Sequence, residues 1–155
     1  PRKGAEVADI TEKSLLDVLE IRRALEELSA QLACDRITKE EIQELVKEAE
    51  GFKRALKSKD VTEIAEADVR FHDVIYLATK NQKLIQLLNN LREQMYRYRV
   101  EYLKKEDVYP QLIREHEEII EHISKKEKEK ATQIVCQHID NQMDTVMGVI
   151  RMKNN

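Results

Sequence analysis

Residues 60–79 read DVTEIAEADVRFHDVIYLAT, and this stretch decides the fold. At the helical angle per residue, its apolar side chains gather within about 60° of Asp68. They are Val61, Ile64, Ala65, Phe71 and Ile75. His72 follows one turn later on the same face. The stretch therefore predicts an amphipathic helix that carries a carboxylate and an imidazole in the middle of its apolar face.

Helical spacing of apolar residues continues on both sides of this stretch. Further helices are predicted over about residues 11–35, 38–58, 81–102, 109–126 and 128–152. Thr38 with Glu41 has the form of a capping box, and Asp60 and Asn81 suit the N-caps of the next two helices. Pro110 suits the first turn of the helix over 109–126. Short joints between these helices predict an all-α fold, an antiparallel bundle of about six helices.

Two predicted helices show long apolar stripes, which we expect to face the core. The stripe of the helix over 11–35 consists of Leu15, Val18, Ile21, Leu25, Leu28 and Leu32. The stripe of the helix over 81–102 consists of Leu84, Leu87, Leu88, Leu91, Met95, Tyr98 and Tyr102.

Composition agrees with a single helical domain. The 155 residues include 41% hydrophobic and 37% charged side chains, which is too apolar for a disordered tail and too charged for a membrane protein. Only three Gly and two Pro are present, too few for the many turns of a β-sandwich or a doubly wound sheet.

The charge balance and the cysteines exclude other classes. A net charge of −3 with mixed signs does not suit a nucleic-acid-binding surface. No apolar run approaches the roughly 20 residues that span a membrane. Cys34 and Cys136 form no CxxC motif and read as reduced core residues, which favours a cytoplasmic location.

Four polar residues are predicted to face one interior. His116 and His138 lie among apolar residues of their helices, as Asp68 and His72 do, whereas His122 faces water. A lone inward histidine is usually a hydrogen-bonded core residue, and a buried Asp usually pairs with Arg. One Asp with three imidazoles is nevertheless a suitable ligand set for Zn, Ni or Mn, so we predict a divalent-metal site.

Two arginines lie near the inner faces of their helices. Arg22 lies between Val18, Leu19 and Leu25, and Arg99 lies beside the stripe of the helix over 81–102. Such arginines commonly pack their stems and keep the guanidinium in water. Alternatively, they clamp an anion, because a guanidinium matches a carboxylate.

The motifs of helical metalloenzymes are missing. The sequence contains neither Glu-x-x-His nor His-Glu-x-x-His. The His72-Asp73 dipeptide resembles that of HD-domain phosphohydrolases, which also need an upstream His, and His72 is the first His of the chain. We therefore expect a binding protein and no enzyme. A metal-dependent hydrolase or lyase, and a helical interaction domain with a structural metal, remain the alternatives.

Several short elements, taken in order, carry a resemblance. They are LEIRRALE at 19–26, DVRFH at 68–72, Asn81 with Leu84, Glu115-His116, and Gln137-His138-Ile139. Together they resemble the C-terminal ligand-sensing (FCD) domain of GntR-family transcription regulators, FadR subgroup, over roughly residues 15–145. The resemblance implies a helical bundle that binds a divalent metal and a small organic acid.

The resemblance also assigns roles to individual residues. It implies that the metal is held by Asp68, His72, His116 and His138. Arg22 is expected to pair with the carboxylate of the effector, and Arg99 is a weaker candidate. Retention of the four ligands points to the metal-dependent branch of the family, and six helices suit its shorter, VanR-like variant. A homodimer is expected.

The family also carries an N-terminal winged helix-turn-helix, which is missing from this sequence. Residues 1–7, PRKGAEV, resemble the end of the wing. We expect residues 1–12 to be the end of the wing and a linker, and residues 13–155 to be the ligand-sensing, metal-binding, dimerising domain. Operator DNA would then be bound only through the missing domain, and no membrane is expected as a partner.

Overall fold

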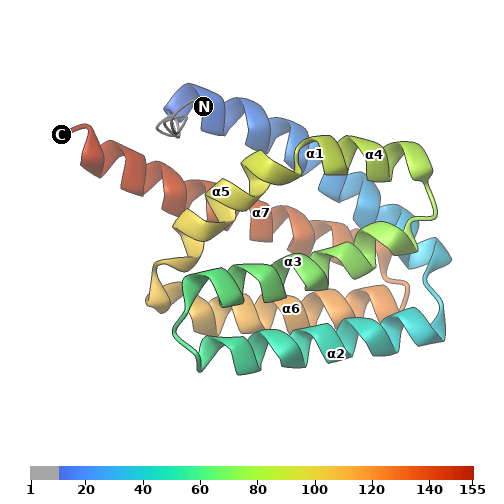
Figure 1. Ribbon diagram of the computed structural model, residues 1–155. Coiled ribbons are helices and arrows are strands. Elements are labelled where there is room, and N and C mark those ends of the chain that lie inside the picture. The colour runs from blue at the N-terminus through green and yellow to red at the C-terminus, as the bar shows by residue number, and fades with distance from the viewer. Residues whose placement is uncertain (1–10) are drawn as a thin grey trace, which may run out of the picture.

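The computed structural model describes residues 11–155, which fold into seven α-helices and a short 3-10 helix, with no strand among them (Figure 1). The elements are α1 (Glu12–Arg36), α2 (Lys39–Leu56), α3 (Val61–Ala78), α4 (Gln82–Asn90), α5 (Arg92–Leu103), η1 (Glu106–Val108), α6 (Tyr109–Ser124) and α7 (Lys128–Lys153). The all-α bundle predicted from the sequence is confirmed. Of the proposed wing end and linker over 1–12, residues 1–10 lie outside the described part, and Thr11 and Glu12 begin α1. No helix within 11–155 has the length and apolar character needed to cross a bilayer.

Two ion pairs show that α1 and α7 are antiparallel. Glu12 at the start of α1 lies 2.9 Å from Arg151 at the end of α7. Asp35 at the end of α1 lies 2.8 Å from Lys128 at the start of α7. These two helices therefore run past each other over their whole length. The pairs α2–α3 and α6–α7 are likewise packed together, and α2, α3 and α6 lie side by side in Figure 1.

Helix α3, the stretch quoted first, packs against α1, α2, α4 and α5. Nine of its 18 residues are buried, among them Asp68 and His72. Its apolar face is small and tight around the polar pair, because Ala65 and Ala67 are fully buried beside Ile64 and Phe71. The phase predicted for this helix is confirmed.

Lysines rather than glycines form three of the joints. Lys59, Lys80 and Lys126 have φ of 59°, 54° and 58°, at the ends of α2, α3 and α6. This left-handed conformation costs a residue with a Cβ about 1–2 kcal/mol. Each positive charge lies near the negative end of a helix dipole. Two of the lysines also reach a neighbouring helix, since Lys80 pairs with Glu41 and Lys126 donates to the carbonyl of Cys34.

The predicted N-caps are present. The Thr38 hydroxyl accepts a hydrogen bond from the amide of Glu41 (3.1 Å), and the Glu41 carboxylate accepts one from the amide of Thr38 (2.9 Å). Asp60 and Asn81 cap α3 and α4 through their side chains. A further capping box at the start of α1, formed by Thr11 with Ser14, was not predicted.

The helix predicted over 81–102 is two helices in the structure. It breaks at Leu91, the C-cap of α4 and N-cap of α5, where φ is −96° and ψ is −2°. Asn89 and Asn90, which precede the break, are weak helix formers, and the Asn89 side chain accepts a hydrogen bond from Arg92 across it. The bundle thus has seven helices where about six were expected, so the helix count does not support the shorter, VanR-like variant.

The buried face of α1 differs from the predicted stripe. The side chains that it buries are Leu15, Leu19, Arg22, Glu26, Ser29, Ala30, Ala33 and Cys34. Ile21 and Leu28, which were expected in the core, are 54% and 39% exposed. Helix α1 contacts α3 and α7 through a face that includes a charged pair, while Leu25 and Leu32 pack towards α4. On α4, Leu87 is also exposed rather than buried.

The capping box at Thr38 gives a direct test of this local structure. We expect Thr38→Ala to lower the free energy of unfolding by about 1 kcal/mol, because the amide of Glu41 loses its acceptor. The measurement is chemical unfolding followed by circular dichroism. Thr62→Ala, at an exposed position in the first turn of α3, is the control and should change stability by less than about 0.5 kcal/mol. Equal losses in both variants would contradict the capping role.

Candidate functional site

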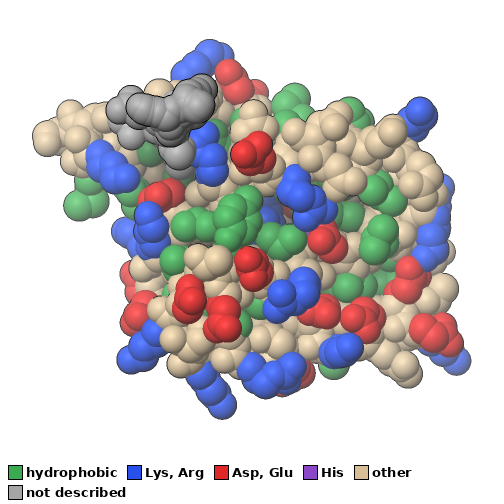
Figure 2. Space-filling view, in the orientation of Figure 1, with side chains coloured by type: hydrophobic (Ala, Val, Ile, Leu, Met, Phe, Trp, Pro, Cys, Tyr) green, Lys and Arg blue, Asp and Glu red, His purple; other side chains and the backbone are tan. Residues whose placement is uncertain are grey.

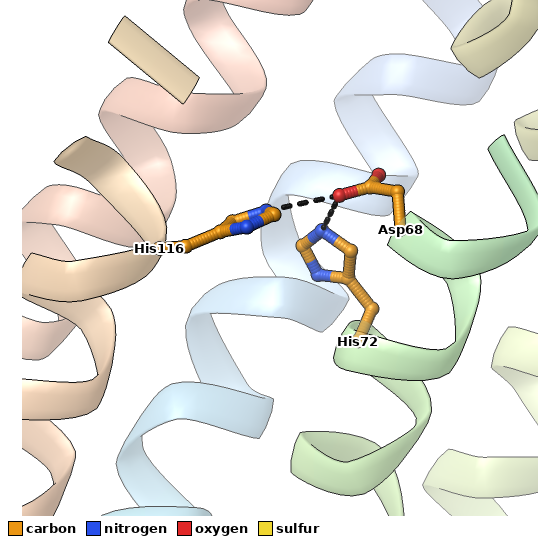
Figure 3. Close-up of side chains that lie close together, drawn as sticks. All are labelled: Asp68, His72 and His116. Atoms are coloured by element: carbon orange, nitrogen blue, oxygen red, sulfur yellow. Dashed lines mark hydrogen bonds and ion pairs between the residues drawn. The ribbon is translucent and has the colours of Figure 1, made fainter. Parts of the chain in front are cut away.

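Three of the predicted metal ligands meet inside the bundle. Asp68 and His72 come from α3 and His116 from α6, and each is 2–3% exposed. One ligand atom from each lies within 4.8 Å of the others. Figure 3 shows both imidazoles directed at the same carboxylate oxygen. The Nε2 atoms of His116 and His72 lie 2.9 and 3.6 Å from Asp68 Oδ1.

His138, the fourth predicted ligand, lies beside this group rather than within it. It projects from α7 and is 2% exposed. Its ring centroid lies 5.1 Å from that of His72 and 6.1 Å from that of His116. Its Nδ1 is 2.9 Å from Oε1 of Glu115. The structure thus brings all three inward histidines together, whereas His122 lies elsewhere and bonds Glu127.

Glu115 fixes the orientation of His138. Its carboxylate is buried and also accepts hydrogen bonds from Asn141 (2.6 Å) and Gln111 (3.1 Å). An ionised carboxylate can only accept, so Nδ1 of His138 carries the proton and Nε2 is left as a potential ligand atom. A carboxylate behind an imidazole is the usual outer partner of a metal-binding histidine.

Asp68 is held ionised by its neighbours. Burial raises the pKa of this carboxyl, but His72, the hydrogen bond from His116 and the charge of Arg99 together bring it well below its usual value. The Nε of Arg99 donates to Oδ2 at 2.7 Å. One oxygen of Asp68 therefore faces the imidazoles while the other is occupied by a guanidinium.

The two imidazoles next to Asp68 are neutral at pH 7. Burial lowers the pKa of His72 from 6.5 to about 4, against the opposing effect of Asp68. Burial likewise lowers the pKa of His116, although its hydrogen bond to Asp68 opposes the shift. Metal ligation requires neutral imidazole, so neither side chain has to lose a positive charge before it binds a metal.

Arg22 is fully buried and belongs to a second polar cluster. Its Nε donates to Glu26 at 3.1 Å and its Nη1 donates to Gln142 at 2.6 Å. Tyr76 donates to the same Glu26 oxygen at 2.7 Å, and its ring centroid lies 6.3 Å from that of His72. The two clusters are therefore neighbours. Arg22 and Arg99 are 0% and 4% exposed. The alternative that they keep their guanidinium groups in water is therefore wrong.

Four buried polar atoms within the described residues have no hydrogen-bond partner. They are Nη2 of Arg22, Nη2 of Arg99, Nε2 of His72 and Nε2 of Gln142. Buried donors are nearly always satisfied in folded proteins, and an unsatisfied one destabilises the fold. All four belong to the two clusters just described. The chemistry of this interior, an incomplete ligand set beside unused cationic donors, fits a metal ion together with an anion.

The site is closed in this structure. A pocket of about 10 Å³ lies between α3 and the α4–α5 segment, with His72, Tyr76 and Arg99 among its lining residues. Asp73 and Arg92 also line it and form an ion pair of 2.8 Å at the protein surface. This volume holds about one water molecule. A larger ligand fits this pocket only if these helices separate.

Four residues of the site were not predicted from the sequence, namely Glu26, Tyr76, Glu115 and Gln142. A usable signal exists for three of them, because each follows an inward polar residue by one helical turn. Glu26 follows Arg22, Tyr76 follows His72, and Gln142 follows His138. Glu115 could have been noticed only as the neighbour of His116 in the Glu115-His116 element.

Comparison with known proteins gives matches over most of this chain. A sequence profile of the FCD domain matches residues 17–141. The HTH-type transcriptional regulator YdhC of Bacillus subtilis is 27% identical over 150 residues, covering 96% of this chain and 67% of that protein. The gluconate operon transcriptional repressor of Bacillus subtilis is 29% identical over 154 residues, covering 94% of this chain and 62% of that protein. This chain thus spans about two thirds of the length of these relatives.

Solved structures share the fold. Streptococcus agalactiae GntR superposes with a TM-score of 0.73 at 23% identity, covering 89% of this chain and 62% of that one. E. coli McbR/YncC gives a TM-score of 0.73 at 18% identity, covering 96% of this chain and 69% of that one.

The lowered pKa of His72 predicts how the metal-free protein responds to acid. Below pH 6.5 the unfolded chain takes up a proton that the folded chain refuses down to about pH 4, so stability falls as the pH falls through this window. The loss attributable to His72 approaches about 3 kcal/mol at the lower end. Thermal unfolding after chelator treatment measures it. His72→Gln should flatten the pH dependence. An unaltered slope in His72→Gln would show that this residue is not the acid-sensitive group.

Proposed function

This chain belongs to the FCD domain family, and we propose that it is the effector-sensing domain of a GntR-type transcriptional regulator. The observation that carries the proposal is the buried Asp68–His72–His116 group, together with unsatisfied guanidinium nitrogens of Arg22 and Arg99. A structural core has no need of these polar atoms, whereas a receptor for a metal and an anion uses them all.

The metal part of the proposal assigns Asp68, His72, His116 and His138 as ligands of one divalent ion, Zn, Ni or Mn. The neutral imidazoles and the ionised Asp68 support it, as does the carboxylate of Glu115 behind His138. When bound, the ion supplies a positive centre to which an oxygen of an organic acid can attach. The protein residues orient that acid and exclude water from it.

The effector part of the proposal assigns a small carboxylate as the sensed ligand. Arg22 is its principal partner, because its Nη2 is buried and unpaired while its other nitrogens are held by Glu26 and Gln142. Arg99 is the second, because one of its nitrogens is fixed on Asp68 and its Nη2 is unpaired. Two relatives are named gluconate operon repressors, so gluconate belongs among the acids to be screened.

The mechanism follows from the closed site. Movement of the α4–α5 segment away from α3 would enlarge the pocket beside His72 and Arg99 and admit an acid to it. Such a ligand shifts the population towards that arrangement. In an intact regulator this shift would alter the relative placement of two DNA-binding domains, whose spacing must match the half-sites of an operator. In this proposal the site binds the acid without converting it. Conversion of a bound acid would instead favour the hydrolase or lyase alternative.

A homodimer and a cytoplasmic location complete the proposal. Ile21 and Leu28 lie two turns apart on α1 and are exposed, as is Leu87 on the adjacent α4. Exposed apolar side chains on neighbouring helices suit contact with a second copy. By contrast, Figure 2 shows acidic and basic side chains interspersed over the face that it presents, which does not suit contact with DNA.

Elemental analysis tests the metal assignment. We expect wild-type protein to retain one divalent ion per chain, and His72→Gln and His116→Gln to bind it at least about tenfold more weakly, because each removes a ligand. His122→Gln, a histidine outside the site, is the matched control and should keep wild-type metal content. If the two site variants retained as much metal as this control, the assignment would be wrong.

Thermal unfolding with a panel of small carboxylates tests the effector assignment. An acid that binds the native, metal-loaded protein raises its unfolding midpoint. We expect Arg22→Lys to bind the acid roughly tenfold more weakly, because lysine keeps the charge beside Glu26 but loses the free Nη2. Arg23→Lys, a half-exposed neighbour that pairs with Asp140, is the control. No shift with any acid, or an equal shift in both variants, would remove Arg22 from the effector site.

A further inference from the structure

The buried charges of this bundle can be counted. Among residues 11–155, five Arg, Asp and Glu side chains are buried, each at most 4% exposed, and each makes ion pairs or hydrogen bonds that stabilise its charged form. They are Arg22, Arg99, Glu26, Asp68 and Glu115. Two cations and three carboxylates leave the interior with one net negative charge. Imidazoles that ligate a metal are neutral and do not change this count.

A divalent ion alone overcompensates this charge. It converts a single net negative charge into a single net positive one, and a buried charge of either sign is unfavourable unless it is paired. One additional negative charge neutralises the interior, whereas two restore the original imbalance. The count therefore distinguishes singly charged from doubly charged ligands.

We propose that the metal-loaded site accepts a carboxylate with a single negative charge, held by Nη2 of Arg22 and Nε2 of Gln142, and discriminates against dicarboxylates. This inference rests on the metal centre of the proposed function. The net charge of the interior supports this inference. The two nitrogens support it as well, because both are buried without a hydrogen-bond partner and they lie on α1 and α7, which pack against each other.

Gln142 supplies an uncharged donor to this anion site. Arg22 can only donate, so the Gln142 atom 2.6 Å from its Nη1 is the amide oxygen, and the amide nitrogen is the free end. Gln142 is 2% exposed. It therefore offers a donor to an anion without adding a charge. A basic residue at this position would raise the net charge of the metal-loaded interior to two, which favours a dianion. An acidic residue would make that net charge zero without any bound anion.

Energetic coupling between metal and acid follows. Since each ligand corrects the charge imbalance left by the other, a monoanion tightens metal binding and the metal tightens binding of the monoanion by the same factor. Tyr76 links the two clusters, with its hydroxyl on Glu26 and its ring beside His72, so metal and anion occupy adjoining space.

Two matched pairs of acids test the inference on the full chain. Glycerate and tartronate differ only in the oxidation of one end, which adds a second negative charge, and gluconate and glucarate differ in the same way. The protein is loaded with one equivalent of metal, free metal is removed, and affinity is measured by calorimetry and by the unfolding midpoint. We expect the monoanion of at least one pair to bind about tenfold or more tightly than its dianionic partner, and to strengthen metal binding by a similar factor.

Two substitutions at Gln142 separate charge from hydrogen bonding. Gln142→Glu supplies the missing negative charge, so it should bind metal about tenfold more tightly than wild type, with no further gain from the monoanion. Gln142→Met keeps the charge count and loses the donor, so it should bind the acids more weakly while keeping the preference for the monoanion.

The outcomes distinguish this inference from the proposed function. Dianions that bind as well as monoanions, or metal binding that neither monoanion strengthens, overturn the inference and leave the metal centre standing. Failure of the wild-type chain to bind metal overturns both.

Discussion

The carboxylate of Asp68 is the contact on which the rest of the interior depends. One oxygen accepts from Arg99 on α5, and the other accepts from His116 on α6 and faces His72 one turn along α3. A single buried group thus sets the relative positions of three helices. Removing one partner of a buried ion pair commonly costs about 3–5 kcal/mol, because the other charge remains buried. The packing around Asp68 is therefore constrained by charge as well as by shape.

The direction of the site residues could be predicted from the sequence, but their partners could not. The phase of α3 is unambiguous because small and branched apolar residues surround Asp68 on its face, and the same reasoning turned His116 and His138 inward. The ion pair between Asp68 and Arg99 could not be predicted, because it joins residues 31 positions apart. This pairing depends on the axial offset between two packed helices, and the periodicity within one helix carries no information about that offset. The break at Leu91, which places Arg99 on a separate short helix, adds to this difficulty.

Helix α1 shows why a leucine stripe can mislead. Its predicted core residues Ile21 and Leu28 are exposed, and Arg22 and Glu26 are inside. A hydrophobicity scale applied to single residues places Arg22 and Glu26 on the surface. They lie one turn apart and form an ion pair, so their charges largely neutralise each other and the pair can be buried. Polar residues repeat at this spacing in Asp68, His72 and Tyr76 as well as in His138 and Gln142. In a bundle with a polar interior, that repeat marks the inner face more reliably than leucine does.

A sensor also has to leave part of its interior unsatisfied. The unpaired nitrogens of Arg22, Arg99 and Gln142 destabilise the closed arrangement, and a ligand that pairs them stabilises whichever arrangement admits it. Arg99 couples this energy to movement of α5, because it lies on α5 and donates a hydrogen bond to Asp68 on α3. Movement of the α4–α5 segment would change the partners of Arg99 while α2, α3 and α6 remain packed together. The element that closes the site is then also the one that reports its occupancy.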